Sequence, residues 1–312
     1  MPSWDIVCKA TENCLSNVDS DGGHWYPNTQ LSEAMSTYID KFVAFVDILG
    51  FKDMVADSVH HGQRLGALLD LVIKLGDGTE RSNYEKYGPI CCPESPRIAR
   101  NLDFRVTQIS DCVIVSAEIS PAGLINLVTH CWQVAIRLLQ LGVLCRGFIS
   151  RGLIYHTDTQ VIGPGYQDTY RAESTVSAFR NRADEVGTPF IEIDEGVVKY
   201  VSVQEDGCVK MMFDRLTKFD GSKVALYPFK RLNHHFLIGG ISGPFDQDVH
   251  LTSVNNIRGW IGRMKVQIMA NVMGKDSAAT RKAEHYIEAL GRQLIELDKT
   301  EQIIRSIPQG TL

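Results

Sequence analysis

The segment from Phe42 to Phe51, FVAFVDILGF, constrains the fold of this chain more than any other stretch. Its first seven residues are strand-forming and almost all apolar, a composition typical of a strand that is buried on both faces of a sheet. One carboxylate, Asp47, stands near the end of this run. Asp is a poor strand residue, and a buried charge without a partner is costly. Asp47 therefore either ends the strand as a solvated turn residue or faces a cation.

Composition narrows the class of protein. The chain has 312 residues, of which 44% are hydrophobic and 22% are charged, values typical of a folded globular protein. The formal net charge of −5 argues against a nucleic-acid-binding surface. We expect no membrane segment, because no stretch approaches the roughly 18 uninterrupted apolar residues that a membrane helix needs. The eight cysteines form no CxxC pair, and the N-terminus lacks a signal-peptide pattern. We therefore expect reduced thiols, no zinc site and a cytoplasmic location.

Three regions are predicted along the chain. Residues 1–40 are polar and lack periodicity, so we expect an N-terminal extension there. Residues 41–245 alternate strands and helices and are predicted to form the main domain. Residues 246–312 are predicted to form a C-terminal helical region. It contains two helices separated by a break at Gly274–Ser277, where Asp276 or Ser277 caps the second helix.

The main domain has a definite order of elements. After the first strand, helical spacing of apolar residues predicts a helix over Met54–Leu75, and residues 76–101 are predicted to be a loop. The segment FRVTQISDCVIVSAE predicts two strands joined tightly at Ser110 and Asp111. A long apolar helix opens at Pro121, and LCRGFISRGLIYH is the next strand. This order predicts an α+β fold, namely a ferredoxin-like βαββαβ core with a C-terminal helical extension.

Two carboxylates are predicted to meet in this core. Asp47 ends the first strand and Asp111 lies in the hairpin turn, and in a ferredoxin-like core the first strand lies beside that hairpin. Two carboxylates at one point repel each other unless cations hold them, which is the layout of a two-metal phosphoryl-transfer site. The alternatives are a simple turn residue at Asp111 and a helix cap at Asp47. We favour the metal interpretation. The turn Ile48–Phe51 offers backbone N–H groups to a phosphate, and Gly50 permits close approach.

A third candidate segment is VIGPGYQDTYRAES. Gly163 and Pro164 suit a turn that leads into a helix, with proline at its first position. Gln167 and Arg171 lie four residues apart and share one helix face. Arg171 is a permanent cation able to stabilise developing phosphate charge. The alternative is an ordinary surface arginine on an amphipathic helix.

Two further arginines, Arg146 and Arg151, lie on the strand after the long helix. Arg151 is within possible reach of a phosphate in this topology. We interpret both as surface residues.

These three segments resemble the class III nucleotidyl cyclases. In that family a strand ends in a metal-binding Asp followed by Ile-x-Gly-Phe, as in VDILGF here, and a hairpin carries a second Asp, as at Ser110-Asp111. A glycine then precedes a helix that bears Asn, Arg four residues later and Glu two beyond. Those places hold Gln167, Arg171 and Glu173, so Gln167 departs from the usual Asn. The resemblance covers about residues 41–185.

The resemblance implies a set of site residues. Asp47, Asp111 and the Ile48 carbonyl would bind two Mn²⁺ or Mg²⁺ ions per site. Arg171 would act in the transition state and Gln167 would orient the ribose. The nucleotide would contact Phe45, Ile48, Gly50 and Phe51, together with the base-reading positions. A head-to-tail homodimer is also implied, because in the family the carboxylates and the arginine come from different subunits.

Thr107 and Gln160 occupy the base-reading positions, where purine cyclases carry longer or charged residues. The chain is therefore most similar to the pyrimidine cyclases of Pycsar anti-phage defence. That similarity implies conversion of UTP to 3′,5′-cyclic UMP and pyrophosphate, as a second messenger that acts on a separate effector. A cytidylate cyclase, a purine class III cyclase or another palm-like phosphoryl-transfer enzyme, and an inactive cyclase-like binding module are the alternatives.

Overall fold

The structure is a computed structural model that describes residues 37–76, 79–89, 101–185, 187–230 and 245–308. All of them belong to one compact unit, Thr37–Leu312. The predictions for residues 1–36 lie outside the described residues.

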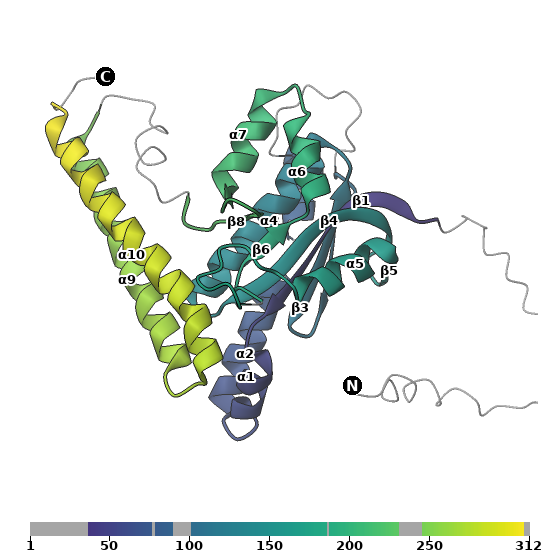
Figure 1. The fold of residues 1–312 in the computed structure, drawn as a ribbon, viewed down its shortest axis with the longest axis horizontal. Helices are drawn as coiled ribbons and strands as arrows, with labels where there is room; N and C mark the ends of the chain where they lie inside the picture. Colours follow the sequence, from purple (N-terminus) through teal and green to yellow (C-terminus); the bar gives the residue numbers. More distant parts are fainter. Residues whose placement is uncertain (1–36, 77–78, 90–100, 186, 231–244, 309–312) are drawn as a thin grey trace, which may run out of the picture. The chain divides into compact units, whose positions relative to one another are not determined.

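Four antiparallel strands form one side of a mixed sheet (Figure 1). Their order across the sheet is β2 (Arg105–Ile109), β3 (Cys112–Glu118), β1 (Ile39–Ile48) and β4 (Cys145–His156). β1 is central because it pairs with β3 on one side and with β4 on the other. This is the strand order of a ferredoxin-like core. The predicted α+β fold class is confirmed.

The sheet continues beyond the predicted core. β6 (Ile191–Ile193) pairs in parallel with β4, and β8 (Val224–Leu226) and β7 (Thr217–Phe219) follow in antiparallel pairs. A two-residue strand, β5 (Val161–Ile162), pairs with the end of β4. Strands of two or three residues are too short to give a periodic sequence signal, so the sequence did not indicate them.

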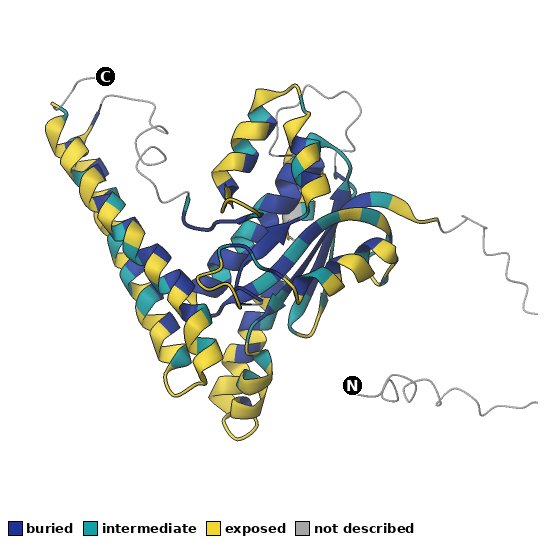
Figure 2. Cartoon of the chain, viewed as in Figure 1, coloured by how far each residue is buried: buried dark blue, intermediate teal, exposed yellow. Residues whose placement is uncertain are grey.

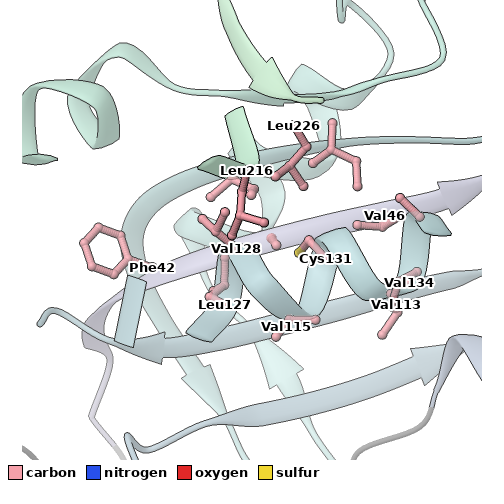
Figure 3. Close-up of a cluster of buried hydrophobic side chains, with 14 of the residues drawn as sticks. Phe42, Val46, Val113, Val115, Leu127, Val128, Cys131, Val134, Leu216 and Leu226 are labelled. Carbon is pink, nitrogen blue, oxygen red and sulfur yellow. The ribbon is translucent and has the colours of Figure 1, made fainter. Parts of the chain in front are cut away.

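Both faces of β1 are buried, as its apolar run predicts. Phe42 and Val46 lie in the larger buried cluster, and Val43 and Phe45 lie in a smaller cluster on the opposite face. Figure 3 shows the larger cluster, where side chains of the sheet pack against Leu127 and its neighbours on α4 (Pro121–Gln140). The alternation follows from the two-residue period of a strand.

The predicted helix over Met54–Leu75 is two helices. α1 (Phe51–Ser58) and α2 (Gly62–Leu75) are separated by a turn, and in the last turn of α1 the Ser58 hydroxyl donates to the Val55 carbonyl. His61 is extended in this turn, which interrupts the helical backbone before α2. A third helix, α3 (Thr79–Tyr87), lies within the segment predicted to be a loop. The predictions of a single helix over Met54–Leu75 and of a loop throughout residues 76–101 were therefore wrong.

α4 begins where the sequence predicts. The Ser120 hydroxyl accepts a hydrogen bond from the Gly123 N–H at 2.9 Å, and Pro121 is the first helical residue. Gly142 follows the helix with a φ of 70°. Among the described helices, α4 alone is long and apolar enough to cross a membrane by length and composition, but 78% of its apolar window is buried inside the structure. Such burial is typical of a core helix.

α5 (Pro164–Glu173) packs on the other face of β4 and β1. Two glycines permit this contact, because a Cβ on Gly152 would lie 2.8 Å from the Cα of Gly165. Two further helices, α6 (Glu195–Ser202) and α7 (Gly207–Leu216), extend the larger cluster around α4.

The C-terminal region contains α9 (Gln247–Val272) and α10 (Ser277–Ser306), with a break between them. The Asp276 carboxylate caps α10 by accepting from the Ala279 N–H at 2.8 Å, so the predicted break and cap are confirmed. Figure 2 shows that the two helices are buried along one side and exposed along the other. The buried side joins the core, where the Tyr286 hydroxyl donates to the Pro189 carbonyl at 2.6 Å.

Candidate active site

The structure brings Asp47 and Asp111 together. Asp47 is the next-to-last residue of β1, and its neighbours across the sheet are Cys112 on β3 and Arg146 on β4. Asp111 directly precedes Cys112, in a tight turn where Ser110 has a φ of 55°. The Ile48 N–H donates to the Asp111 carbonyl at 3.1 Å, which fixes the turn against the end of β1.

The surroundings of Asp47 disfavour its negative charge. Burial raises the pKa of Asp47 to about 7, and the carboxylates of Asp111 and Glu173 add to this shift, while Arg146 opposes it. Two of the three carboxylates were predicted site residues. Their mutual repulsion is the property that a bound cation would relieve.

Arg146 and Glu173 form an ion pair beside Asp47. The Nε atom of Arg146 donates to the Oε1 atom of Glu173, and the two side chains are only 17% and 7% exposed. The interpretation of Arg146 as a surface residue was therefore wrong. Its proximity to Asp47 depends on the register between β1 and β4, which the sequence does not display. Arg151 binds Asp40 at 2.6 Å and is about half exposed, as expected for a surface pair.

The backbone of the turn after Asp47 is not covered by side chains at Gly50. Gly50 has a left-handed φ of 78°, and a Cβ added there would contact nothing within 4 Å. α1 begins at Phe51, and the first N–H groups of a helix have no partner within it. A phosphate can approach this turn closely. The side chain of Ile48 points into the core, and its carbonyl belongs to the turn.

The residues present fit a hard divalent cation. Asp47, Asp111 and the Ile48 carbonyl offer only oxygen ligands, which suit Mg²⁺ or Mn²⁺. Within the described part of the chain, no group of three or more His, Cys, Asp or Glu side chains is arranged to hold a metal. Two carboxylates and a backbone carbonyl are what this end of β1 offers to a cation, and any further ligands would have to come from substrate phosphates and water.

Gln167 and Arg171 lie apart from the carboxylates of their own chain. The buried face of α5 contains Gly165, Thr169 and Glu173, whereas the side chain of Arg171 is 69% exposed and pairs with Asp168 at 3.1 Å. Gln167 is exposed on the same side as Arg171. Within one chain, these two residues face away from the sheet.

Phe45 lies beneath α5. Its ring packs edge-on against Tyr170, with 5.2 Å between the ring centres, and it is 3% exposed. In one chain it supports the helix.

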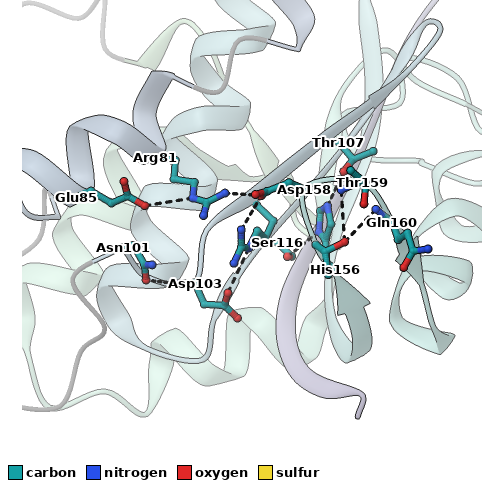
Figure 4. A network of polar contacts seen from close by, with 12 residues as sticks. Arg81, Glu85, Asn101, Asp103, Thr107, Ser116, His156, Asp158, Thr159 and Gln160 are labelled. Atoms are coloured by element: carbon teal, nitrogen blue, oxygen red, sulfur yellow. Dashed lines mark hydrogen bonds and ion pairs between the residues drawn. The ribbon is translucent and has the colours of Figure 1, made fainter. Parts of the chain in front are cut away.

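Thr107 belongs to a polar network at the other end of the same sheet face. Its hydroxyl lies 2.9 Å from Nε2 of His156, and the Ser116 hydroxyl lies 2.8 Å from Nδ1 of the same ring (Figure 4). Burial, and then the charges of Lys41 and Arg105, lower the pKa of His156 to about 4, so the ring is neutral at physiological pH. The sequence did not single out His156, because its two partners come from different strands.

Gln160 lies in the turn that follows His156. Its backbone N–H donates to the Thr157 hydroxyl at 3.1 Å, and the residue is exposed. The neighbouring Asp158 pairs with Arg105 at 2.6 Å and also with Arg81, which ties this turn to β2 and α3. Thr107 and Gln160 thus lie in adjoining groups of polar contacts, because His156 and Thr157 are consecutive residues (Figure 4).

The sequence matches no protein-family model. It also matches no curated protein. Among solved structures, the chain is similar to a class III adenylyl cyclase-like ATP-binding protein from Pseudomonas aeruginosa, with 14% identity and a TM-score of 0.30. That similarity covers 52% of this chain and only 35% of the Pseudomonas protein.

A second similar structure is the catalytic core of a rhodopsin-guanylyl cyclase with converted specificity, in complex with ATPαS. The identity is 10% and the TM-score is 0.26, over 61% of this chain and 93% of that one. Both TM-scores are low, so neither similarity by itself establishes the function of this chain.

Proposed function

We propose that this protein is a nucleotidyl cyclase that converts UTP to 3′,5′-cyclic UMP and pyrophosphate. The observation that carries the proposal is the convergence of Asp47 and Asp111 beside the open turn at Gly50. A half-buried carboxylate whose pKa is raised by burial and by a second carboxylate, next to a turn that a phosphate can approach, is suited to phosphoryl transfer.

The reaction is one displacement. The ribose 3′-hydroxyl attacks the α-phosphorus in line, loses its proton to solvent water, and forms the new O3′–P bond as the bond from the α-phosphorus to the bridging oxygen of pyrophosphate breaks. Asp47, Asp111 and the Ile48 carbonyl would hold two divalent cations, which would acidify the hydroxyl and neutralise the triphosphate. The turn Ile48–Phe51 holds the phosphates through its backbone N–H groups.

Arg171 and Gln167 are assigned to the site of a second copy of the chain. Both are exposed on the face of α5 that is turned away from the sheet, and Arg171 forms an ion pair with the exposed Asp168, so another subunit can reach both side chains. Arg171 stabilises the charge that develops on the phosphate, and Gln167 orients the ribose. The functional unit is a head-to-tail homodimer. The contact between its two subunits closes on itself, as in other symmetric dimers, so the dimer contains two shared sites.

The base is assigned to Thr107 and Gln160. A hydroxyl and an amide can together donate to a uracil carbonyl and accept from its ring N–H. The partner of Thr107 is a histidine that is neutral at physiological pH, so the contact made by Thr107 itself is uncharged. A site built to hydrogen-bond its substrate penalises an analogue that leaves buried polar groups unpaired, by roughly 1–3 kcal/mol per group.

The cellular role follows the resemblance to the Pycsar cyclases. Cyclic UMP would act in the cytoplasm as a second messenger in anti-phage defence, by abortive infection through a separate effector. Plaque counts on cells that carry the wild-type gene, compared with the Asp47→Ala variant, test this role. Equal plaque counts would contradict it.

A competition assay tests the reaction and the base. The purified full chain is incubated with Mn²⁺ and equal amounts of ATP, GTP, CTP and UTP, and the products are identified by mass. Cyclic UMP is expected as the main product. Cyclic CMP would overturn only the choice of uracil, a cyclic purine nucleotide would overturn the pyrimidine assignment, and no cyclic product would favour a binding module.

Variants at Thr107 refine the assay. Thr107→Lys should lower UTP turnover, because it places a charge where we expect a neutral contact. Thr107→Ser keeps the hydroxyl and serves as the matched control. Equal losses in both variants would argue that Thr107 supports the fold and does not contact the base.

A further inference from the structure

A cavity of about 330 Å³ lies between residues 181–185 and the first turns of α10. It is distinct from the carboxylate site, because its lining includes neither Asp47 nor Asp111. Among the described residues that line it, Ala278 is the only apolar one and none is aromatic. Pockets for drug-like ligands and bases are rich in apolar and aromatic side chains. This cavity therefore suits a small, strongly hydrated ligand.

Cations line the cavity from both sides. Arg182 comes from the loop, and Arg281 and Lys282 come from α10. Arginine presents a fork of donors that matches phosphate oxygens, and lysine adds a compact positive charge.

The surroundings of Lys282 disfavour its positive charge. Its ammonium group is half-buried, and no ion pair joins it to any residue in the described part of the chain. Burial and then the charge of Arg146 lower the pKa of Lys282, and together they outweigh the opposing carboxylates of Glu173, Asp276 and Glu185. A half-desolvated cation beside a like charge is unfavourable unless an anion joins it.

The carboxylates of the cavity do not offset these cations fully. Glu185 is committed elsewhere, since its Oε1 lies 2.7 Å from Nε2 of His285 and its Oε2 accepts from the Asn181 N–H at 3.0 Å. Asp184 and Glu284 are exposed, so water and salt screen their charges.

We propose that this cavity binds a phosphate-bearing anion of about the size of pyrophosphate, through Arg182, Arg281 and Lys282. The inference does not depend on the cyclase activity, because it rests on other residues. Lys282 also neighbours the Arg146–Glu173 pair, which borders Asp47. Occupancy of the cavity is therefore felt electrostatically at the carboxylate site.

Isothermal titration of the full chain with inorganic pyrophosphate tests the proposal. The buffer contains EDTA, so that no divalent cation draws the ligand to Asp47 and Asp111. We expect saturable binding at one site, weakened about 10-fold or more by Lys282→Gln and by Arg182→Gln, because each loses a charge-assisted contact. Arg292→Gln, on α10 but outside the cavity, is the matched control and should bind as the wild type does.

Two outcomes would overturn the assignment. One is the absence of saturable binding by the wild type, or equal affinity in the wild type and the cavity variants. The other is loss of binding in Asp47→Asn, which would move the anion to the carboxylate site. Arg182 is exposed, so its replacement leaves the core intact, and circular dichroism of each variant verifies the fold.

Discussion

The backbone N–H of Ile48 donates to the backbone carbonyl of Asp111, with 3.1 Å between the two atoms. This bond joins the end of β1 to the β2–β3 hairpin, although more than sixty positions of sequence separate the two residues. It holds the Asp111 turn beside Asp47, independently of any side-chain rotamer. The candidate site is therefore organised by the backbone of the sheet.

The first prediction concerns the two carboxylates. Asp47→Asn and Asp111→Asn should each lower cyclisation at least about 100-fold, since weaker changes around metal ligands already cost 10- to 100-fold. Mn²⁺ should raise the melting temperature of the wild type, because it binds only the folded chain, and should raise that of either variant much less. Asp57→Asn, an exposed carboxylate on α1, is the control. Full activity in either site variant would rule out the metal assignment.

The second prediction concerns the shared site. Asp47→Ala and Arg171→Ala should each be inactive alone, and an equal mixture should recover about one quarter of the wild-type activity. Half of all dimers in the mixture contain one chain of each variant, and each of these heterodimers has one intact site out of two. A mixture of Asp47→Ala with Asp111→Ala should stay inactive, because both changes damage the same half of a site. No recovery in the first mixture, despite proven subunit exchange, would place the site within one chain.

The third prediction concerns His156 and pH. Its pKa is about 4 in the folded protein against an ordinary value of 6.5, so the unfolded chain takes up the proton first as pH falls. The free energy of unfolding should therefore decrease between about pH 6.5 and pH 4, by on the order of 3 kcal/mol from this group.

Urea denaturation at several pH values measures this effect. His156→Gln should flatten the pH dependence in that window, whatever its effect on absolute stability. His60→Gln, at an exposed position, should leave the slope unchanged. An unaltered slope in His156→Gln would show that the ring is protonated at little cost in the folded state.

The fourth prediction concerns the contact between Gly142 and α9. Gly142 has a φ of 70°, and a Cβ there would lie 2.5 Å from the backbone carbonyl carbon of Gln267. Gly274 has a similar φ of 76° but nothing within 4 Å of an added Cβ. Gly274→Ala should lower the free energy of unfolding by about 1 kcal/mol, the cost of a left-handed backbone. Gly142→Ala should cost about 1–3 kcal/mol more, because α9 must shift.

Urea denaturation of the two variants separates these costs. Equal losses in the free energy of unfolding would indicate that α9 is not packed against Gly142.

Local sequence patterns determined much of the core. The apolar run FVAFVDI predicted a strand buried on both faces, and β1 is such a strand because its alternate side chains enter two different clusters. Proline at the start of α4 and Asp276 before α10 predicted where those helices begin, since both act through bonds within a few residues. The same local order placed Asp47 and Asp111 at the ends of neighbouring strands.

Other features were decided by contacts between distant segments. Strand register put Arg146 beside Asp47 and joined His156 to Thr107 and Ser116, and no local pattern encodes register between strands. The packing of α10 set Lys282 near that site. The sequence by itself determined which elements form and which residues end them, because those choices depend on near neighbours. Only the tertiary structure decided which charges meet, because pairing across the sheet depends on the whole chain.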